Sequence, residues 1–201
     1  VKPVVAPSSA ALLAQVNSPT LGQIVEYINL HSDNDGAETL LRHVGIATGN
    51  GGSYIGGVKG VRATLTKLGL DVSKATIYDG SGLTRANKVP LDLLAGAVRV
   101  AASKDHPELR HLLSGLPIAG FNGSLKRGER FTTPGTSAGT GLVHAKTGTL
   151  TSVHSLAGYA LDRTGTLLVF AIASDTVPVP KTLDARAALD RATAVLANCG
   201  C

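Results

Sequence analysis

Several residue types are rare or absent in this sequence. It has no methionine and no tryptophan, and aromatic residues make up only 3% of its 201 residues. The core therefore has to rest on Val, Leu, Ile and Ala, with many turns permitted by the 24 glycines. No stretch reaches the ~18 apolar residues of a membrane span, and no signal pattern opens the chain. Because the sequence starts at Val1 without a methionine, we expect a processed, trimmed or partial chain.

Charge is limited as well. Charged residues make up 16% of the chain and hydrophobic residues 43%, which is typical of a folded protein and excludes a disordered one. The net charge of +5 favours anionic partners. Nucleic acid is disfavoured, because the basic residues are dispersed and no aromatic residues interleave with them. An anionic polymer or a substrate with a carboxylate fits the charge equally well.

The two cysteines, Cys199 and Cys201, both lie at the C-terminal end. They are too few for a metal site and too close in sequence to bridge each other in ordinary disulfide geometry. Two interpretations stay open: a frayed tail, or pairing with a cysteine outside this chain, as an exported protein would allow.

Hydrophobic periodicity predicts helices in the first half of the chain. Ser18 and Pro19 are a predicted N-cap and first helical residue, after an extended lead-in with a strand near residues 12–16. Further helices are predicted over 35–44 with Gly45 as the stop, 58–68, 90–98 and 109–113, with a strand candidate at 76–78. Residues 120–142 are predicted to form a long loop, and loops of that length are usually functional.

Strand-like segments follow at residues 142–147, 153–161 and 167–174, joined by short turns at 148–152 and 162–165. Short turns between successive strands predict an antiparallel meander, on which the helix predicted over 183–196 packs. The predicted fold class is α+β, an antiparallel sheet flanked by helices, without a second domain.

The tripeptide Lys146-Thr147-Gly148 is predicted to end the first strand. A fixed positive charge, hydroxyl groups and open backbone N–H groups there suit a carboxylate and a developing oxyanion. The alternative is an ordinary strand end with a solvated lysine.

The tripeptide Ser32-Asp33-Asn34 lies in the predicted turn between two helices. Its residues are favoured in turns, so Asp33 or Asn34 could simply cap the next helix. Both tripeptides in this order are much rarer than either alone. With Ser-x-x-Lys, they form the signature of penicillin-binding proteins and serine β-lactamases.

The chain resembles the class C low-molecular-mass penicillin-binding proteins, which are D-alanyl-D-alanine carboxypeptidases/endopeptidases of peptidase S13 type. The resemblance covers residues 18–174. It rests on HSDNDGAETLLRHVG (31–45), YDGSGLTRAN (78–87), LPIAGFNGSL (116–125), VHAKTGTL (143–150) and LAGYA (156–160). Asn122 stands where that family usually has Asp. The resemblance implies part of a penicillin-binding-protein/serine β-lactamase-like transpeptidase domain.

The nucleophilic motif of this family is missing. None of the nine lysines has a serine three positions before it. The nearest form, Thr64 to Lys67, follows the second motif, whereas the family's nucleophile precedes it. We therefore expect residues 1–201 to be the C-terminal part of the catalytic domain, with Ser-x-x-Lys on an upstream segment of the same polypeptide.

The resemblance implies a role for each motif residue. Ser32 would relay a proton to the leaving D-alanine, Asn34 would bind the substrate's peptide carbonyl, and Lys146 would supply positive potential. Thr147 and Thr149 would hold the terminal carboxylate, Gly148 would permit close approach, and the Thr149 N–H would form half of an oxyanion hole. The Ser81 and Arg85 side chains are predicted to be structural.

The implied substrate is a peptidoglycan stem peptide ending in D-Ala-D-Ala, and β-lactams would be inhibitors. No metal or other cofactor is implied, and the substrate implies an extracytoplasmic location in the cell envelope or periplasmic space. One alternative is a β-lactamase, which is disfavoured because residues 45–80 contain no glutamate for deacylation. Another is a non-catalytic fragment that binds peptidoglycan or acts as a scaffold.

Overall fold

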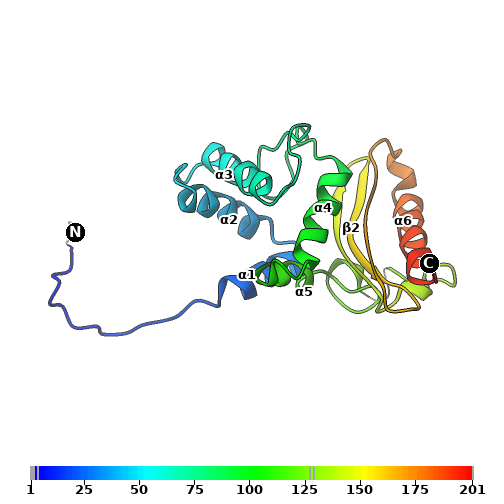
Figure 1. Cartoon of the computed structure of the whole chain (residues 1–201), viewed down its shortest axis with the longest axis horizontal. Coiled ribbons are helices and arrows are strands. Elements are labelled where there is room, and N and C mark those ends of the chain that lie inside the picture. The colour runs from blue at the N-terminus through cyan, green and yellow to red at the C-terminus, as the bar shows by residue number, and fades with distance from the viewer. Residues whose placement is uncertain (1–2, 4, 127, 129, 201) are drawn as a thin grey trace.

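The computed structural model describes residues 3, 5–126, 128 and 130–200. Helices come first along the chain, and the sheet and a last helix follow (Figure 1). The elements are α1 (Leu21–His31), α2 (Asn34–Ala47), α3 (Tyr54–Lys67), α4 (Leu91–Ala102), η1 (Pro107–Leu109), α5 (Arg110–Ser114), η2 (Gly123–Leu125), η3 (Ser137–Gly139), β1 (Val143–Leu150), β2 (Val153–Leu161), β3 (Leu167–Ser174), η4 (Val179–Lys181) and α6 (Thr182–Ala197).

The sheet is the predicted antiparallel meander, with strand order β1-β2-β3. The predicted end of the first strand was wrong, because β1 continues to Leu150. The turn to β2 is only two residues long, and Ser152 takes a left-handed conformation in it with φ of 67°. Lys146-Thr147-Gly148 therefore lies within β1 and is held by full pairing to β2.

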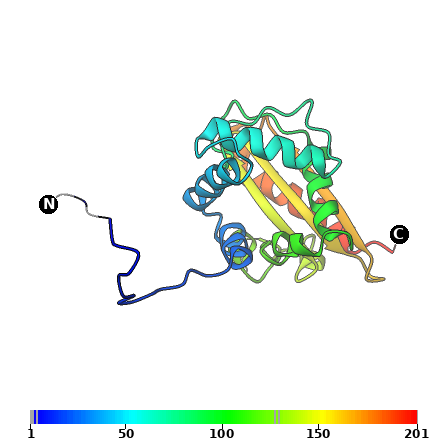
Figure 2. The same cartoon turned by 60° about the vertical axis from the view of Figure 1, so that its left-hand side comes forward.

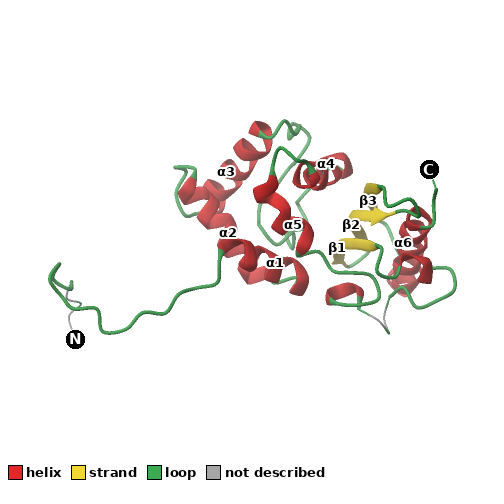
Figure 3. Cartoon of the chain, turned by 60° about the horizontal axis from the view of Figure 1, so that its bottom comes forward, coloured by secondary structure: helices red, strands yellow, loops and turns green. Residues whose placement is uncertain are grey.

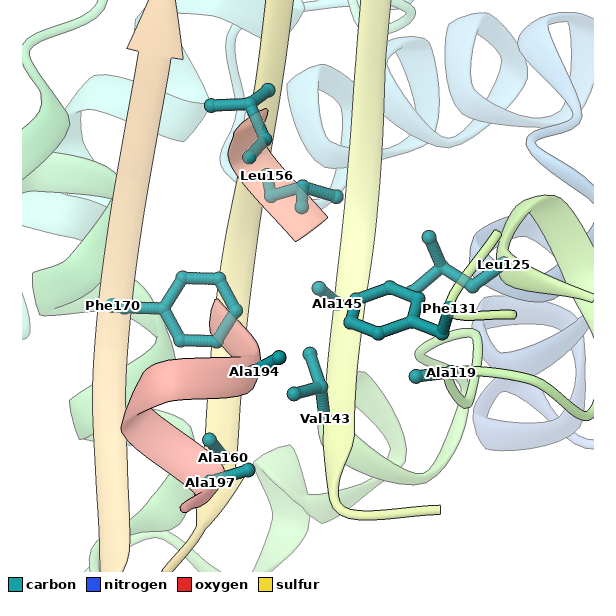
Figure 4. Close-up of a cluster of buried hydrophobic side chains, with 11 residues drawn as sticks. Ala119, Leu125, Phe131, Val143, Ala145, Leu156, Ala160, Phe170, Ala194 and Ala197 are labelled. Carbon is teal, nitrogen blue, oxygen red and sulfur yellow. The ribbon is translucent and has the colours of Figure 1, made fainter. Parts of the chain in front are cut away.

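The sheet packs between α4 on one face and α6 on the other (Figure 3). The β2 strand alternates strictly, and every second residue from His154 to Ala160 is buried. The α6 face carries the main hydrophobic cluster, in which Leu125, Leu156 and Val143 are fully buried (Figure 4). At its margin Arg130 and Asp190 form a buried ion pair. The prediction that the last helix covers the sheet is confirmed.

Glycines bring α2 and α3 together. The predicted stop at Gly45 was wrong, because α2 continues to Ala47 and Gly45 is buried against the loop that follows. A Cβ atom on Gly45 would lie 2.3 Å from the Gly51 carbonyl oxygen, and one on Gly57 would lie 2.4 Å from the Leu41 carbonyl oxygen. The two helices thus meet backbone to backbone, which only glycine allows.

The N-terminal segment corrects two further predictions. Residues 5–19 are exposed and contain no strand, and they extend away from the helices (Figure 2). Helix α1 begins at Leu21 with Thr20 as its N-cap, not Ser18. The reason is a capping box, in which Thr20 and Gln23 satisfy each other's backbone N–H groups.

Smaller elements complete the fold. The strand candidate at residues 76–78 is only an isolated bridge between Thr76 and Lys88. Cys199 is disulfide-bonded, and its backbone carbonyl oxygen accepts a hydrogen bond from Arg163 N–H, so this residue does not lie on a frayed tail. Cys201 lies outside the described residues. Within the described part of the chain, no helix is both long and apolar enough to cross a membrane.

Candidate active site

The turn between α1 and α2 presents Ser32 and Asn34. Ser32 takes a left-handed conformation with φ of 54°, and its N–H closes α1 by donating to Ile28. Asp33 is the N-cap of α2, and its carboxylate accepts a hydrogen bond from Gly36 N–H at 3.0 Å. The capping interpretation is therefore right for Asp33. The Ser32 and Asn34 side chains remain exposed and are not used to build the helix ends.

Lys146 joins this turn to the sheet. Its Nζ donates a hydrogen bond of 2.7 Å to Ser32 Oγ, across 114 residues of sequence. It donates a second bond of 3.0 Å to the Thr147 carbonyl oxygen. Burial lowers the pKa of the Lys146 ammonium, because desolvation disfavours its charged form. This lysine is therefore a fixed, partly desolvated cation, unlike the solvated lysine of the alternative interpretation.

Thr147 turns its hydroxyl toward a residue that the sequence analysis did not single out. Its Oγ1 donates a hydrogen bond of 2.8 Å to Ser124 Oγ, on η2. The loop before η2 is closed by Asn122, whose Oδ1 accepts a hydrogen bond of 2.7 Å from Ile118 N–H. An amide oxygen can accept this bond as a carboxylate would, so the departure from Asp preserves the turn. The position of Ser124 in the LPIAGFNGSL segment was the available signal.

The other residues of the third motif have different neighbours. Gly148 pairs with Ser155 of β2, and a Cβ on it would lie 2.3 Å from Ser155 Oγ. The close approach at this glycine is therefore made by a neighbouring side chain. Thr149 is exposed and pairs with His154. Among the described residues, neither Thr149 nor Asn34 makes a side-chain hydrogen bond, so the structure does not bring their side chains into the Ser32–Lys146 contact.

The segment at residues 78–87 links helix α2 to the turn between β1 and β2. Glu38 on α2 accepts hydrogen bonds from Gly80 N–H at 2.8 Å and from Ser81 N–H and Oγ at 3.0 and 2.5 Å. Arg85 donates to the Thr151 carbonyl oxygen at 3.0 Å. Asp79 holds the turn. Burial raises its pKa, but hydrogen bonds from Thr84 and Asn87 outweigh this and lower it. These contacts agree with the structural role predicted for Ser81 and Arg85.

The site thus combines one cation with several hydroxyl groups. Such a set can hold a carboxylate and relay protons. Within the described residues, no group of three His, Cys, Asp or Glu side chains could hold a metal ion. Ser-Asp-Asn and Lys-Thr-Gly are two of the motifs of the penicillin-binding proteins and serine β-lactamases, and the structure brings them together at the Ser32–Lys146 contact.

Comparison with known proteins assigns the chain more narrowly. The family described as D-Ala-D-Ala carboxypeptidase 3 (S13) matches residues 1–196, so the chain belongs to that family. A carboxypeptidase of Mycobacterium tuberculosis is 38% identical over 197 residues, covering 98% of this chain and 41% of the relative. Carboxypeptidase DacB of Mycolicibacterium smegmatis is 38% identical, covering 94% and 40%. The chain therefore spans about two fifths of the length of these relatives.

A solved structure supports the same assignment. Penicillin binding protein 4 from Haemophilus influenzae, in complex with a β-lactam, superposes with a TM-score of 0.72. It is 26% identical, and the match covers 85% of this chain and 40% of that one. A predatory endopeptidase from Bdellovibrio bacteriovorus has a TM-score of 0.63 at 19% identity, which shows the shared fold alone.

Proposed function

We propose that this chain carries the second and third motifs of a serine-type D-alanyl-D-alanine carboxypeptidase, which acts on peptidoglycan stem peptides and is inhibited by β-lactams. The observation that carries the proposal is the 2.7 Å contact between Lys146 Nζ and Ser32 Oγ. Two motifs that are far apart in sequence meet there. Within Ser32-Asp33-Asn34, only Asp33 has another identified role, as the N-cap of α2.

The direction of that contact suits a proton relay. Ser32 Oγ accepts a hydrogen bond from Lys146, so its own O–H is free to point elsewhere. We assign it to donate toward the nitrogen of the leaving D-alanine, with the lysine charge favouring the transfer. Burial lowers the pKa of Lys146, which makes its protons easier to give up than those of a solvated lysine.

Three motif side chains receive the substrate in this proposal. Asn34 would donate to the substrate's peptide carbonyl, and the Thr147 and Thr149 hydroxyls would hold its terminal carboxylate. Thr149 N–H would supply half of the oxyanion hole. Gly148, flat against Ser155, keeps β1 free of a side chain at this point.

The attacking serine is not on this chain. We propose that residues 1–201 form the C-terminal part of the catalytic domain and that a segment bearing Ser-x-x-Lys completes it. Two facts support this: the chain lacks that motif, and it matches about two fifths of its relatives' length. The attack would form an acyl-enzyme, which water then hydrolyses. The substrate requires an extracytoplasmic location in the cell envelope.

The test is labelling with a tagged penicillin. The protein is isolated with every segment that co-purifies with it, labelled, and mapped by peptide mass. We expect the label on a serine of a Ser-x-x-Lys segment, and Lys146→Ala should lower labelling at least about 100-fold, as loss of one electrostatic group in an active site does. Lys181→Ala is the matched control, because that lysine is exposed and its one ion pair within the described part of the chain is with Asp184.

Other outcomes contradict the proposal in different ways. Absence of label from every segment would indicate a non-catalytic peptidoglycan-binding or scaffold fragment. A label that is lost within seconds would indicate a β-lactamase. Equal labelling of Lys146→Ala and the unaltered protein would contradict the active-site role proposed for Lys146.

A further inference from the structure

Ser124 is held in place from both sides. The residue before it, Gly123, has φ of 53°, and a Cβ on it would lie 2.7 Å from the Leu30 carbonyl oxygen. The residue after it, Leu125, is fully buried in the main cluster. Helix η2 is thus wedged between the end of α1 and strand β1. Ser124 therefore reaches Thr147 from a rigid support, which lies against Leu30, two residues before Ser32 in the sequence.

Counting donors shows what this contact can do. Thr147 and Ser124 have one O–H group each, and in the structure the Thr147 O–H donates its hydrogen bond to Ser124 Oγ. An anion beside Thr147 would accept the hydrogen bond from the Thr147 O–H in place of Ser124. The Ser124 O–H could then turn and donate to Thr147 Oγ1, so that both hydroxyls remain satisfied. A hydroxyl that accepts one bond while donating another is a stronger donor, because the two bonds polarise each other.

We propose that Ser124 is a positioning residue of the carboxylate-binding site, acting through Thr147. It orients the Thr147 hydroxyl before substrate arrives and strengthens it as a donor once a carboxylate is bound. This inference rests on the function proposed above. It adds a third element, η2, to the two motifs that carry Ser32 and Lys146.

A purely structural role would be different in kind. If the Ser124–Thr147 bond only tied η2 to β1, its loss would affect all ligands alike through the position of β1. If the bond serves the carboxylate-binding site, its loss should weaken the reaction only with ligands that carry a carboxylate. The two roles can therefore be distinguished by comparing one ligand with its carboxylate free and with its carboxylate blocked.

The experiment measures the second-order rate constant of acylation of the whole protein by benzylpenicillin and by its methyl ester. Ser124→Ala should lower the rate about tenfold for the acid, as expected for loss of the hydrogen bond that orients the Thr147 hydroxyl, and less than about twofold for the ester. Ser124→Thr, which keeps the hydroxyl, should restore at least half of the loss. In a double-mutant cycle with Thr147→Val, Ser124→Ala should add no further loss, because its effect passes through Thr147.

Thr166→Ala is the matched control. Thr164 and Thr166 form a hydroxyl pair of 2.8 Å as well, in the turn between β2 and β3, and its loss should leave both rates unchanged. Equal loss for acid and ester, with a lowered melting temperature, would overturn the positioning role in favour of a structural one. Unchanged rates for Ser124→Ala would overturn it outright. If the unaltered protein is not acylated at all, the proposed function fails first and this inference fails with it.

Discussion

The sheet with α6 and the hairpin of α2 and α3 are held together by opposite means. In the sheet half, large side chains such as Leu125 and Leu156 fill the space between elements and are fully buried. In the hairpin, the buried positions are Leu41 and four glycines, while Tyr54 and Ile55 face outward. One region is closed by interlocking side chains, and the other by backbone in contact with backbone. Removing atoms should therefore damage the first, and adding atoms the second.

The largest effect is expected from removing atoms in the sheet half. Leu156→Ala should lower the free energy of unfolding by about 3 kcal/mol, because the cavity left in a close-packed cluster collapses only in part. Urea unfolding of the chain measures this. Val195→Ala on the outer face of α6 is the control, since Val195 is 67% exposed and should contribute less than about 0.5 kcal/mol. Equal losses of stability in Leu156→Ala and Val195→Ala would contradict the conclusion that buried side chains hold the sheet half together.

Adding one methyl group should damage the hairpin. Gly57→Ala places a Cβ 2.4 Å from the Leu41 carbonyl oxygen, which is backbone and cannot move aside without shifting α2. Alanine favours helix by up to ~1 kcal/mol, but overpacking outweighs this, and we expect a net loss of about 2 kcal/mol. Hydrogen exchange should locate the loss in α2 and α3.

The matched control for this substitution is Gly96→Ala in α4. A Cβ there meets only Leu70 Cδ2, at 2.8 Å, and the end of a leucine side chain can rotate away. We expect its stability to change by less than about 0.5 kcal/mol, because the gain in helix propensity offsets a small repacking. A stabilised Gly57→Ala would contradict the backbone contact.

The same contrast explains which parts of the fold could be predicted. Apolar stripes of large residues predicted the existence of the helices and of the meander, because those residues do the packing there. They could not predict that α2 passes through Gly45, since periodicity of large side chains contains no information on glycine contacts. The end of β1 was misplaced because Gly148 looked like a turn residue, whereas it pairs with Ser155.

The site was predictable only in part, for a related reason. The resemblance named Ser32 and Lys146 as members of one site, and the structure places their side chains 2.7 Å apart. The LPIAGFNGSL segment indicated the neighbourhood of Ser124 but not its partner, because Thr147 is 23 residues away and only the tertiary packing of η2 joins the two residues. The roles of Asn34 and Thr149 stay predictions, since they depend on a substrate.

The smallest expected effect concerns His154, one of the buried polar residues of the sheet half. It is 2% exposed, and neither ring nitrogen has a hydrogen-bond partner among the described residues. Burial lowers its pKa, and the positive charges of Arg186 and Arg130 lower it further. The folded protein therefore binds its proton less readily than the unfolded chain, whose histidine titrates near pH ~6.5. Stability is intact above that pH and falls as the pH drops below it.

The predicted fall in stability at low pH tests whether the packed side chains of the sheet half exclude a charge on His154. Each such histidine contributes at most about 1.4 kcal/mol of lost stability per pH unit below the unfolded pKa. His154→Leu should reduce the loss of stability measured by urea unfolding between pH 7 and pH 5, because leucine has no proton to bind.

His144→Leu is the matched variant. Burial lowers the pKa of His144 too, but this ring is only half-buried and stacks on Tyr159. Its removal should therefore reduce the loss of stability less than His154→Leu does. Parallel pH profiles for His154→Leu and the unaltered chain would mean that the unpartnered imidazole does not oppose protonation. The sheet half would then tolerate a buried charge without an ionic partner, unlike the paired charges of Arg130 and Asp190.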